Sequence, residues 1–172
     1  MLARLGFPLA KPLLHALDAE TGEVRWTFDT VLGDDLWGDP EVNSGGGAWM
    51  TPSIDVATGT IYWGIANPAP FPGTEAFPNG TSRPGPNLYT DSVVALDAAT
   101  GELRWYHQAV PHDLFDWDLT HTLVVDLGDG EQVVVGTGKL GRVLGLDPAR
   151  AAWVKPLPLV GGVHVFPPET GT

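Results

Sequence analysis

The sequence predicts an all-β fold, a partial β-propeller of two to three blades in which each blade is an antiparallel four-stranded sheet. The first observation behind this prediction is internal repetition, because ALDAETGEVRW from Ala16 and ALDAATGELRW from Ala95 agree at nine of eleven positions. A third copy, SIDVATGTIYW, runs from Ser53 to Trp63. The second observation is composition: 22 Gly and 16 Pro residues are typical of many turns, while 43% hydrophobic residues and 7 Trp supply a core.

Each copy encodes a β-hairpin locally. An apolar pair precedes an Asp, Thr-Gly follows three residues later, and a Trp comes eight residues after the Asp, as in Asp18 to Trp26 and Asp97 to Trp105. Asp and Thr side chains accept hydrogen bonds from turn amides, and Gly adopts positive φ at little cost. A Trp at a constant offset is expected to pack one repeat onto its neighbour. A fourth copy, GLDPARAAW from Gly145, lacks Thr-Gly and is degenerate.

The spacing of these hairpins divides the chain into blades. A propeller blade takes about 40 to 50 residues, and the copies at Asp18, Asp97 and Asp147 are separated by 79 and 50 residues. The first interval therefore holds one blade with insertions. We expect the end of one blade at 13–28, a complete blade at 48–108, a further blade at 119–157 and an irregular tail at 158–172.

Within these blades, strands are expected where β-branched and alternating residues lie between turn signals. In the complete blade the strands are expected near 49–55, 60–65, 92–97 and 103–108, with a long Pro-, Gly- and Asn-rich loop at 67–89. In the next blade they are expected from Thr122, Gln132 and Arg142, and near Trp153. No helix is expected. Because two or three blades do not close a ring, the sequence is expected to be an internal part of a longer propeller.

Charge and residue usage exclude several classes of function. Nine Lys and Arg against 21 Asp and Glu give a net charge of −12, which excludes the basic surface expected for nucleic acid or an anionic membrane. The absence of Cys excludes disulfides, thiolate metal sites and c-type haem attachment. No apolar run is long enough for a membrane span. No signal peptide is expected at the N-terminus, because Pro8, Lys11 and Pro12 interrupt its apolar run.

The repeat A-L-D-A-x-T-G-x-x-x-W resembles the tryptophan-docking motif of quinoproteins. These are the eight-bladed propeller dehydrogenases that use pyrroloquinoline quinone (PQQ), such as methanol and alcohol dehydrogenases. The resemblance covers residues 13–148, and it implies a partial propeller of the quinoprotein eight-bladed type. It also implies a periplasmic or extracellular location.

Two residues match the positions that contact the quinone in this family. Trp49 closes Gly45-Gly46-Gly47-Ala48-Trp49, which is similar to the family segment whose Trp stacks flat on the ring. An indole face is a rigid apolar surface that suits a planar heterocycle. Lys139, in Gly-Lys-Leu-Gly, takes the position of a cation that contacts the quinone oxygens. A fixed ammonium there would stabilise negative charge on the reduced ring.

Three further residues match the metal and base positions. Asn67 begins Asn-Pro-Ala-Pro, which is similar to the family segment whose Asn oxygen coordinates the metal, although Gly64-Ile65-Ala66 replaces the usual Gly-Thr-Gly before it. Asp116, in His-Asp-Leu-Phe-Asp-Trp-Asp, takes the position of the catalytic base beside the metal. Asp118 matches an extra Asp of lanthanide-using members, so the ion is either Ca²⁺ or a lanthanide. Carboxylate and amide oxygens suit such hard cations.

The resemblance implies a PQQ-dependent dehydrogenase segment. Asp116 would deprotonate the hydroxyl of a small alcohol or sugar while hydride passes to metal-bound PQQ. Electrons would then leave to an external acceptor, a cytochrome c or a quinone. The family supplies a metal-binding Glu and other quinone contacts from preceding blades, and many members carry a disulfide of neighbouring cysteines that this sequence lacks. The chain is therefore expected to be incomplete as an enzyme by itself.

Two alternatives remain open. One is a non-catalytic propeller of the same repeat type that acts as a protein-binding or assembly module without cofactor. Such a module would share the Asp-x-x-Thr-Gly-x-x-x-Trp repeat but would have no reason to keep Asn67, Asp116 and Lys139. The other is a degenerate remnant of an enzyme, which the decay of the pattern after Asp147 suggests.

Overall fold

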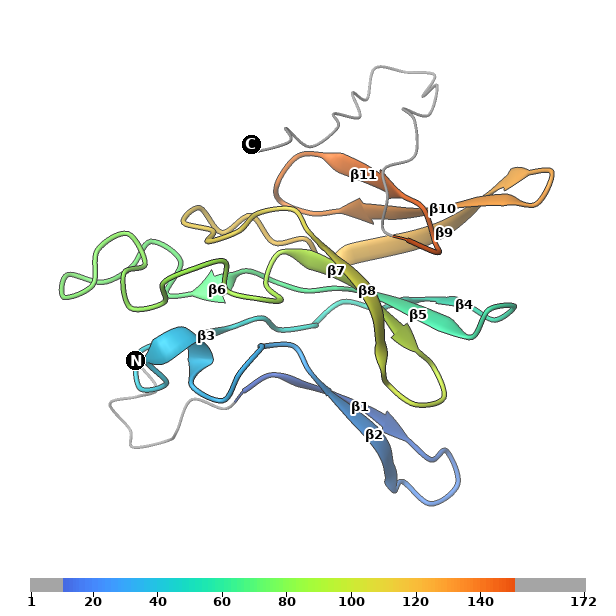
Figure 1. Ribbon diagram of the computed structural model, residues 1–172, viewed down its shortest axis with the longest axis horizontal. Coiled ribbons are helices and arrows are strands. Elements are labelled where there is room, and N and C mark those ends of the chain that lie inside the picture. Colours follow the sequence, from blue (N-terminus) through green and yellow to red (C-terminus); the bar gives the residue numbers. More distant parts are fainter. Residues whose placement is uncertain (1–10, 151–172) are drawn as a thin grey trace.

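The computed structural model describes residues 11–150, and in this range the strands form antiparallel sheets that lie beside one another (Figure 1). One sheet pairs β1 (Leu13–Leu17) with β2 (Val24–Asp29). The central sheet has the order β4 (Ser53–Asp55), β5 (Thr60–Gly64), β7 (Ser92–Asp97) and β8 (Leu103–Gln108). The third has the order β11 (Val143–Leu146), β10 (Glu131–Thr137) and β9 (His121–Gly128).

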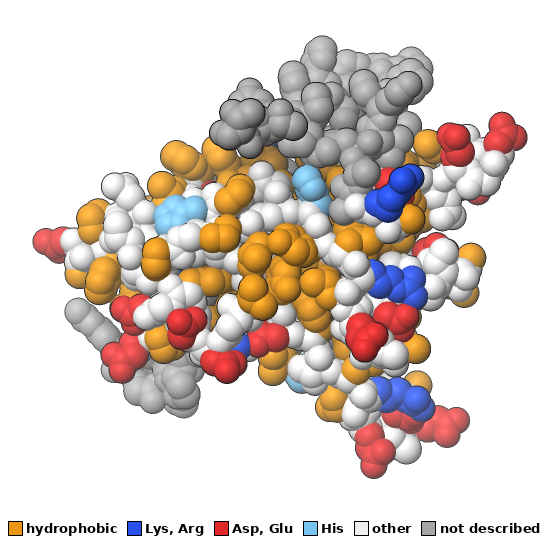
Figure 2. Space-filling model, in the orientation of Figure 1, with side chains coloured by type: hydrophobic (Ala, Val, Ile, Leu, Met, Phe, Trp, Pro, Cys, Tyr) orange, Lys and Arg blue, Asp and Glu red, His pale blue; other side chains and the backbone are white. Residues whose placement is uncertain are grey.

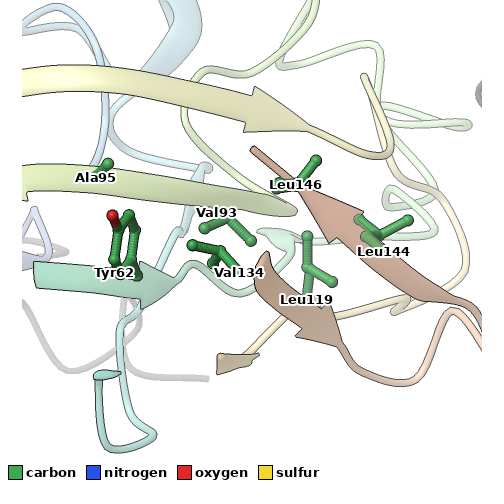
Figure 3. Packing of buried hydrophobic residues seen from close by; sticks show 7 residues of the cluster. All are labelled: Tyr62, Val93, Ala95, Leu119, Val134, Leu144 and Leu146. Carbon is green, nitrogen blue, oxygen red and sulfur yellow. The ribbon is translucent and has the colours of Figure 1, made fainter. Parts of the chain in front are cut away.

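Strand β7 shows why the three sheets pack as layers. Side chains alternate between the two faces of a strand, and here both faces are covered. Val93 and Ala95 join a cluster that is completed mainly by residues of the β9–β11 sheet and its approach, namely Leu119, Val134, Leu144 and Leu146 (Figure 3). Val94 and Leu96 instead join Leu14 of β1 and Ile65. The near-continuous apolar run of β7 therefore belongs to a strand buried on both sides.

The repeated hairpins have the turn chemistry that their sequences encode. The Oδ1 atoms of Asp18 and Asp97 each accept two turn amides, at +2 and +3, over distances of 2.9–3.0 Å. The indole nitrogens reach the turn of a later copy: Trp26 donates to the Ala98 carbonyl beside Asp97 at 3.0 Å, and Trp105 donates to the Pro148 carbonyl beside Asp147 at 2.8 Å. Each of these Trp residues therefore ties one sheet to the hairpin turn of the next.

Charged side chains gather at these hairpin tips, at the right of the view in Figure 2. Arg25 pairs with Asp18 at 2.5 Å and Arg104 with Asp97 at 2.7 Å. The long loops extend from the opposite end of the sheets, at the left of Figure 1. The repeat turns and the long loops thus occupy different ends of the molecule.

The structure differs from the expected strands in three details. The strand expected at 49–55 is short, because only 53–55 pairs, and the loop 67–89 contains β6 (Pro68–Ala69), which pairs with β3 (Ser44–Gly45). A short 3₁₀ helix at Leu36–Gly38 was not expected. The strand near Trp153 and the tail 158–172 lie outside the described residues. Residues 11–150 contain no helix long and apolar enough to cross a membrane.

Candidate functional site

The Gly-rich segment and the start of the long loop form one wall of the candidate site. The Gly46 amide donates to the Asn67 carbonyl at 3.0 Å, and the Ala66 amide donates to the Gly47 carbonyl at 2.9 Å. A Cβ on Gly45 would lie 2.5 Å from the Asn67 carbonyl oxygen, and Gly45 has a φ of +106°. The two segments approach this closely only because Gly stands at position 45.

Trp49 reaches this wall through Gly47. A Cβ on Gly47 would lie 3.5 Å from Cδ1 of the indole, so the ring lies on the side of Gly47 where a side chain would be. The side chain is otherwise open, with 59% of the residue exposed. An exposed Trp offers a free aromatic face, which is unusual for so large an apolar side chain.

Asp116, Asp118 and Lys139 come together although Lys139 lies on a different loop. The Lys139 ammonium is 2.8 Å from Oδ2 of Asp116 and 2.7 Å from Oδ2 of Asp118. The other oxygen of Asp118, Oδ1, accepts the Asn67 backbone amide at 2.8 Å. Asp118 therefore connects the loop that follows β5 with the loop between β10 and β11.

A glycine allows Lys139 to approach. Its backbone amide donates to the Asp118 carbonyl at 2.9 Å. A Cβ on the preceding residue, Gly138, would lie 1.8 Å from that same carbonyl oxygen. No side chain fits there, so Gly138 is required for the backbone contact that brings the ammonium to the two carboxylates.

The charges at this point are closely coupled. The hydrogen bond from Lys139 to Asp116, and then the one to Asp118, raise the pKa of the ammonium above its usual value. Asp118 is 3% exposed as a residue, whereas 37% of the Asp116 side chain is exposed. Of the two carboxylates, Asp116 is the one that a small molecule in solvent can reach.

Within residues 11–150, four of the five residues singled out by sequence are thus joined by direct contacts, whereas Trp49 lies on the Gly-rich segment whose backbone bonds to the Asn67 loop. The donor set consists of two carboxylates and an amide, all hard oxygen ligands. The described residues contain no group of three His, Cys, Asp or Glu side chains that could hold a metal. The set therefore fits a hard cation but is incomplete, and further ligands would have to come from elsewhere.

Two buried titratable residues, Arg83 and Asp91, were not singled out by the sequence. Arg83 is fully buried and donates to the carbonyls of Phe71 and Asp113, at 2.8 and 2.5 Å, and to Oδ1 of Asn87 at 2.5 Å. Asp91 is also fully buried, and burial, followed by the charge of Asp113, raises its pKa to about 8. A lone Arg in a Pro- and Gly-rich loop and an Asp beside a strand carry no signal that distinguishes them from solvated residues.

The family is shown by comparison with known proteins. The fold is a partial β-propeller of the quinoprotein eight-bladed type, and a family model named PQQ, for the β-propeller domain of glucose/ethanol/alcohol dehydrogenases, matches residues 10–149. The chain belongs to this PQQ dehydrogenase propeller family.

Individual relatives agree with this assignment. The chain is 35% identical over 135 residues to the quinohemoprotein alcohol dehydrogenase of Comamonas testosteroni, covering 67% of this chain and 18% of that protein. The crystal structure under the same name matches with a TM-score of 0.70 at 26% identity, over 84% of this chain and 24% of that one. Subunit 1 of the methanol dehydrogenase (cytochrome c) of Methylorubrum extorquens is 34% identical over 143 residues, 78% of this chain and 21% of that subunit.

A europium-containing methanol dehydrogenase has the same fold, with a TM-score of 0.70 at 21% identity over 85% of this chain and 29% of that one. The chain thus spans about a fifth of the curated relatives described above.

Proposed function

We propose that the chain supplies the part of the active site that contains the catalytic base in a PQQ-dependent dehydrogenase. This dehydrogenase would oxidise a small alcohol or a sugar hydroxyl. One observation carries the proposal: Asn67, Asp116, Asp118 and Lys139, which lie on three loops, converge through contacts of 2.7–2.8 Å. Asn67 joins this cluster through its backbone amide. A non-catalytic propeller would need the repeat hairpins, but it would not need the side chains of Asp116, Asp118 and Lys139 to meet.

Asn67, Asp116 and Asp118 would hold the cation. The amide nitrogen of Asn67 donates to the Pro68 carbonyl at 2.9 Å, so the amide oxygen is the atom left to face a ligand. The buried carboxylate of Asp118 is held at Oδ1 by a hydrogen bond from the backbone amide of Asn67. Trp49 would bind one face of the quinone, and Lys139 would contact its oxygens. When bound, PQQ supplies the hydride acceptor and the cation, Ca²⁺ or a lanthanide, acts as a Lewis acid.

Asp116 would act as the base. Its carboxylate is the more exposed of the two, so the hydroxyl of a substrate can come within hydrogen-bonding distance of an oxygen and transfer its proton there. Lys139 holds Oδ2 of Asp116 at 2.8 Å, which orients the carboxylate.

The acceptor of the electrons would be external, a cytochrome c or a quinone. One relative, the Methylorubrum extorquens methanol dehydrogenase, has cytochrome c in its name. The sequence has no Cys for covalent haem attachment. We also propose a periplasmic location, as an extension of the family assignment.

The test is cofactor binding and dye reduction. PQQ with Ca²⁺ or La³⁺ is added to the chain and to a longer form that includes the flanking coding sequence, while tryptophan fluorescence and dye reduction with simple alcohols are followed. We expect fluorescence quenching that weakens in Trp49→Leu, and dye reduction by the longer form that Asp116→Asn abolishes. If the longer form neither binds PQQ nor reduces the dye with either metal, the proposal is wrong and the alternative of a protein-binding propeller gains support.

A further inference from the structure

Asp113 is a buried carboxylate on the loop that carries Asp116, and both of its oxygens are used by that loop. It is 1% exposed. Its Oδ1 accepts the backbone amide of Phe115 at 2.7 Å, and its Oδ2 accepts the backbone amide of Trp117 at 2.6 Å. The two bonds lie on either side of Asp116.

This pattern differs from the turns elsewhere in the chain. In the repeat hairpins a single oxygen of Asp18 or Asp97 accepts the amides at +2 and +3. Asp113 instead uses separate oxygens for the amides at +2 and +4, so the residue between them, Asp116, is held on both sides. The +2 bond is that of an Asx turn, and the +4 bond to the second oxygen adds a contact on the far side of Asp116.

The backbone of Asp116 needs this support. Its φ is +64°, a left-handed conformation that non-glycine residues adopt only rarely. Phe115 and Trp117 continue the arrangement, because their rings stack with centroids 4.8 Å apart. With the flanking amides fixed, the Asp116 side chain lies where its Oδ2 pairs with Lys139 while the carboxylate stays partly exposed.

Asp113 is itself fixed from behind. The buried Arg83 donates to the Asp113 carbonyl at 2.5 Å and also to the Phe71 carbonyl at 2.8 Å. Arg83 thus ties the Asp116 loop to the loop that begins at Asn67. Burial lowers the pKa of the Arg83 guanidinium, and the opposite charge of the nearby Asp113 carboxylate partly offsets this effect.

We propose that Asp113 is a positioning residue that holds the Asp116 carboxylate at the cation and substrate side of the site. The proposal rests on the proposed function of Asp116. Asp113 acts through the two flanking amides and touches neither the cation nor the substrate. Replacing a residue that orients a metal ligand in this way lowers the metal affinity about 10- to 100-fold.

The experiment compares Asp113→Asn with Asp97→Asn in the full chain. Each substitution replaces a carboxylate that accepts two backbone amides, but Asp97 lies in a repeat turn at the other end of β7. Tb³⁺ luminescence excited through tryptophan measures the cation affinity, and backbone chemical shifts of residue 116 report its φ. We expect Asp113→Asn to lower the Tb³⁺ affinity at least tenfold and to move the shifts of residue 116 away from left-handed values. Asp97→Asn should change neither.

The outcomes separate this proposal from the proposed function. If Asp113→Asn leaves both the affinity and the shifts of residue 116 unchanged, Asp113 has no positioning role. If Asp116→Asn binds Tb³⁺ as tightly as the unmodified chain, Asp116 is not a metal ligand. The positioning role of Asp113 is then judged from the backbone chemical shifts of residue 116 alone. Should Asp113→Asn not fold, Asp113→Glu keeps both acceptor oxygens but displaces them, and its shifts and affinity are judged by the same criteria.

Discussion

The buried carboxyl of Asp91 makes the stability of this chain fall as the pH rises through the neutral range. Asp91 is fully buried, and neither of its side-chain oxygens has a hydrogen-bond partner among residues 11–150. Its backbone is fastened on both sides, by its amide to the Ala66 carbonyl at 3.2 Å and by its carbonyl to the Ala109 amide at 2.8 Å. The side chain therefore cannot leave the interior without breaking these bonds.

The sign and size of the effect follow from the pKa of Asp91. Burial, and then the charge of Asp113, raises this pKa from 3.8 to about 8. Between these two values the folded chain binds a proton that the unfolded chain has lost, so the free energy of unfolding decreases with rising pH. The slope is about 1.4 kcal/mol per pH unit, which amounts to about 2.7 kcal/mol between pH 5 and pH 7.

The perturbation is Asp91→Asn, which removes the ionisation and keeps the shape. We expect the unmodified chain to lose about 2.7 kcal/mol of unfolding free energy relative to the variant between pH 5 and pH 7, measured by urea unfolding at several pH values. As a control, hydrogen bonds to Arg104 and to turn amides lower the pKa of Asp97 to about 2, so Asp97→Asn should alter the profile only in acid. Parallel profiles for the unmodified chain and Asp91→Asn from pH 5 to pH 7 would refute the reasoning.

Three further predictions concern the site and the packing. Lys139→Met should raise the Tb³⁺ affinity about tenfold, which equals about 1.4 kcal/mol, because the ammonium no longer competes for two carboxylates. As a control, Lys11→Met also frees two carboxylates but should leave the Tb³⁺ luminescence of the site unchanged. Trp105→Ala should cost about 3 kcal/mol in urea unfolding through lost packing and its indole hydrogen bond, whereas the exposed Trp49→Ala should stay within about 0.5 kcal/mol. Gly138→Ala should destabilise by about 1–3 kcal/mol and weaken Tb³⁺ binding, because its Cβ would lie 1.8 Å from a facing carbonyl oxygen; an unchanged melting temperature would contradict this.

The repeat hairpins were predictable because their information is local. Asp97, Thr100 and Gly101 encode the turn within five residues, and the amides that bond to Asp97 are the ones that the motif supplies. The short 3₁₀ helix at Leu36–Gly38 was not predictable in this way. Leu36 and Trp37 both have positive φ, and Trp37 donates to the distant Leu88 carbonyl at 3.0 Å, so tertiary contact overrides local preference there.

The site residues were proposed from family resemblance, and their spatial meeting is a property of the fold. Nothing local to Lys139 indicates two carboxylates, because its partners lie more than twenty residues earlier on another loop. Asp91 and Arg83 show the limit more clearly. Their burial follows from loops that close over them, and no pattern in their neighbouring residues distinguishes a buried charge from an exposed one.

Asp118 has a structural role that affects how any test of the site is interpreted. Its carboxylate accepts the Asn67 amide and pairs with the Lys139 ammonium, and its carbonyl accepts the Lys139 amide. Asp118→Asn would therefore loosen two loops at the same time as it removed a charge, and a loss of cation binding would have two causes. Within this cluster the Asp116 side chain pairs with Lys139, and its carboxylate is more exposed than that of Asp118. Asp116→Asn thus changes the chemistry with the smaller change in structure, and it is the variant from which a role in catalysis should be judged.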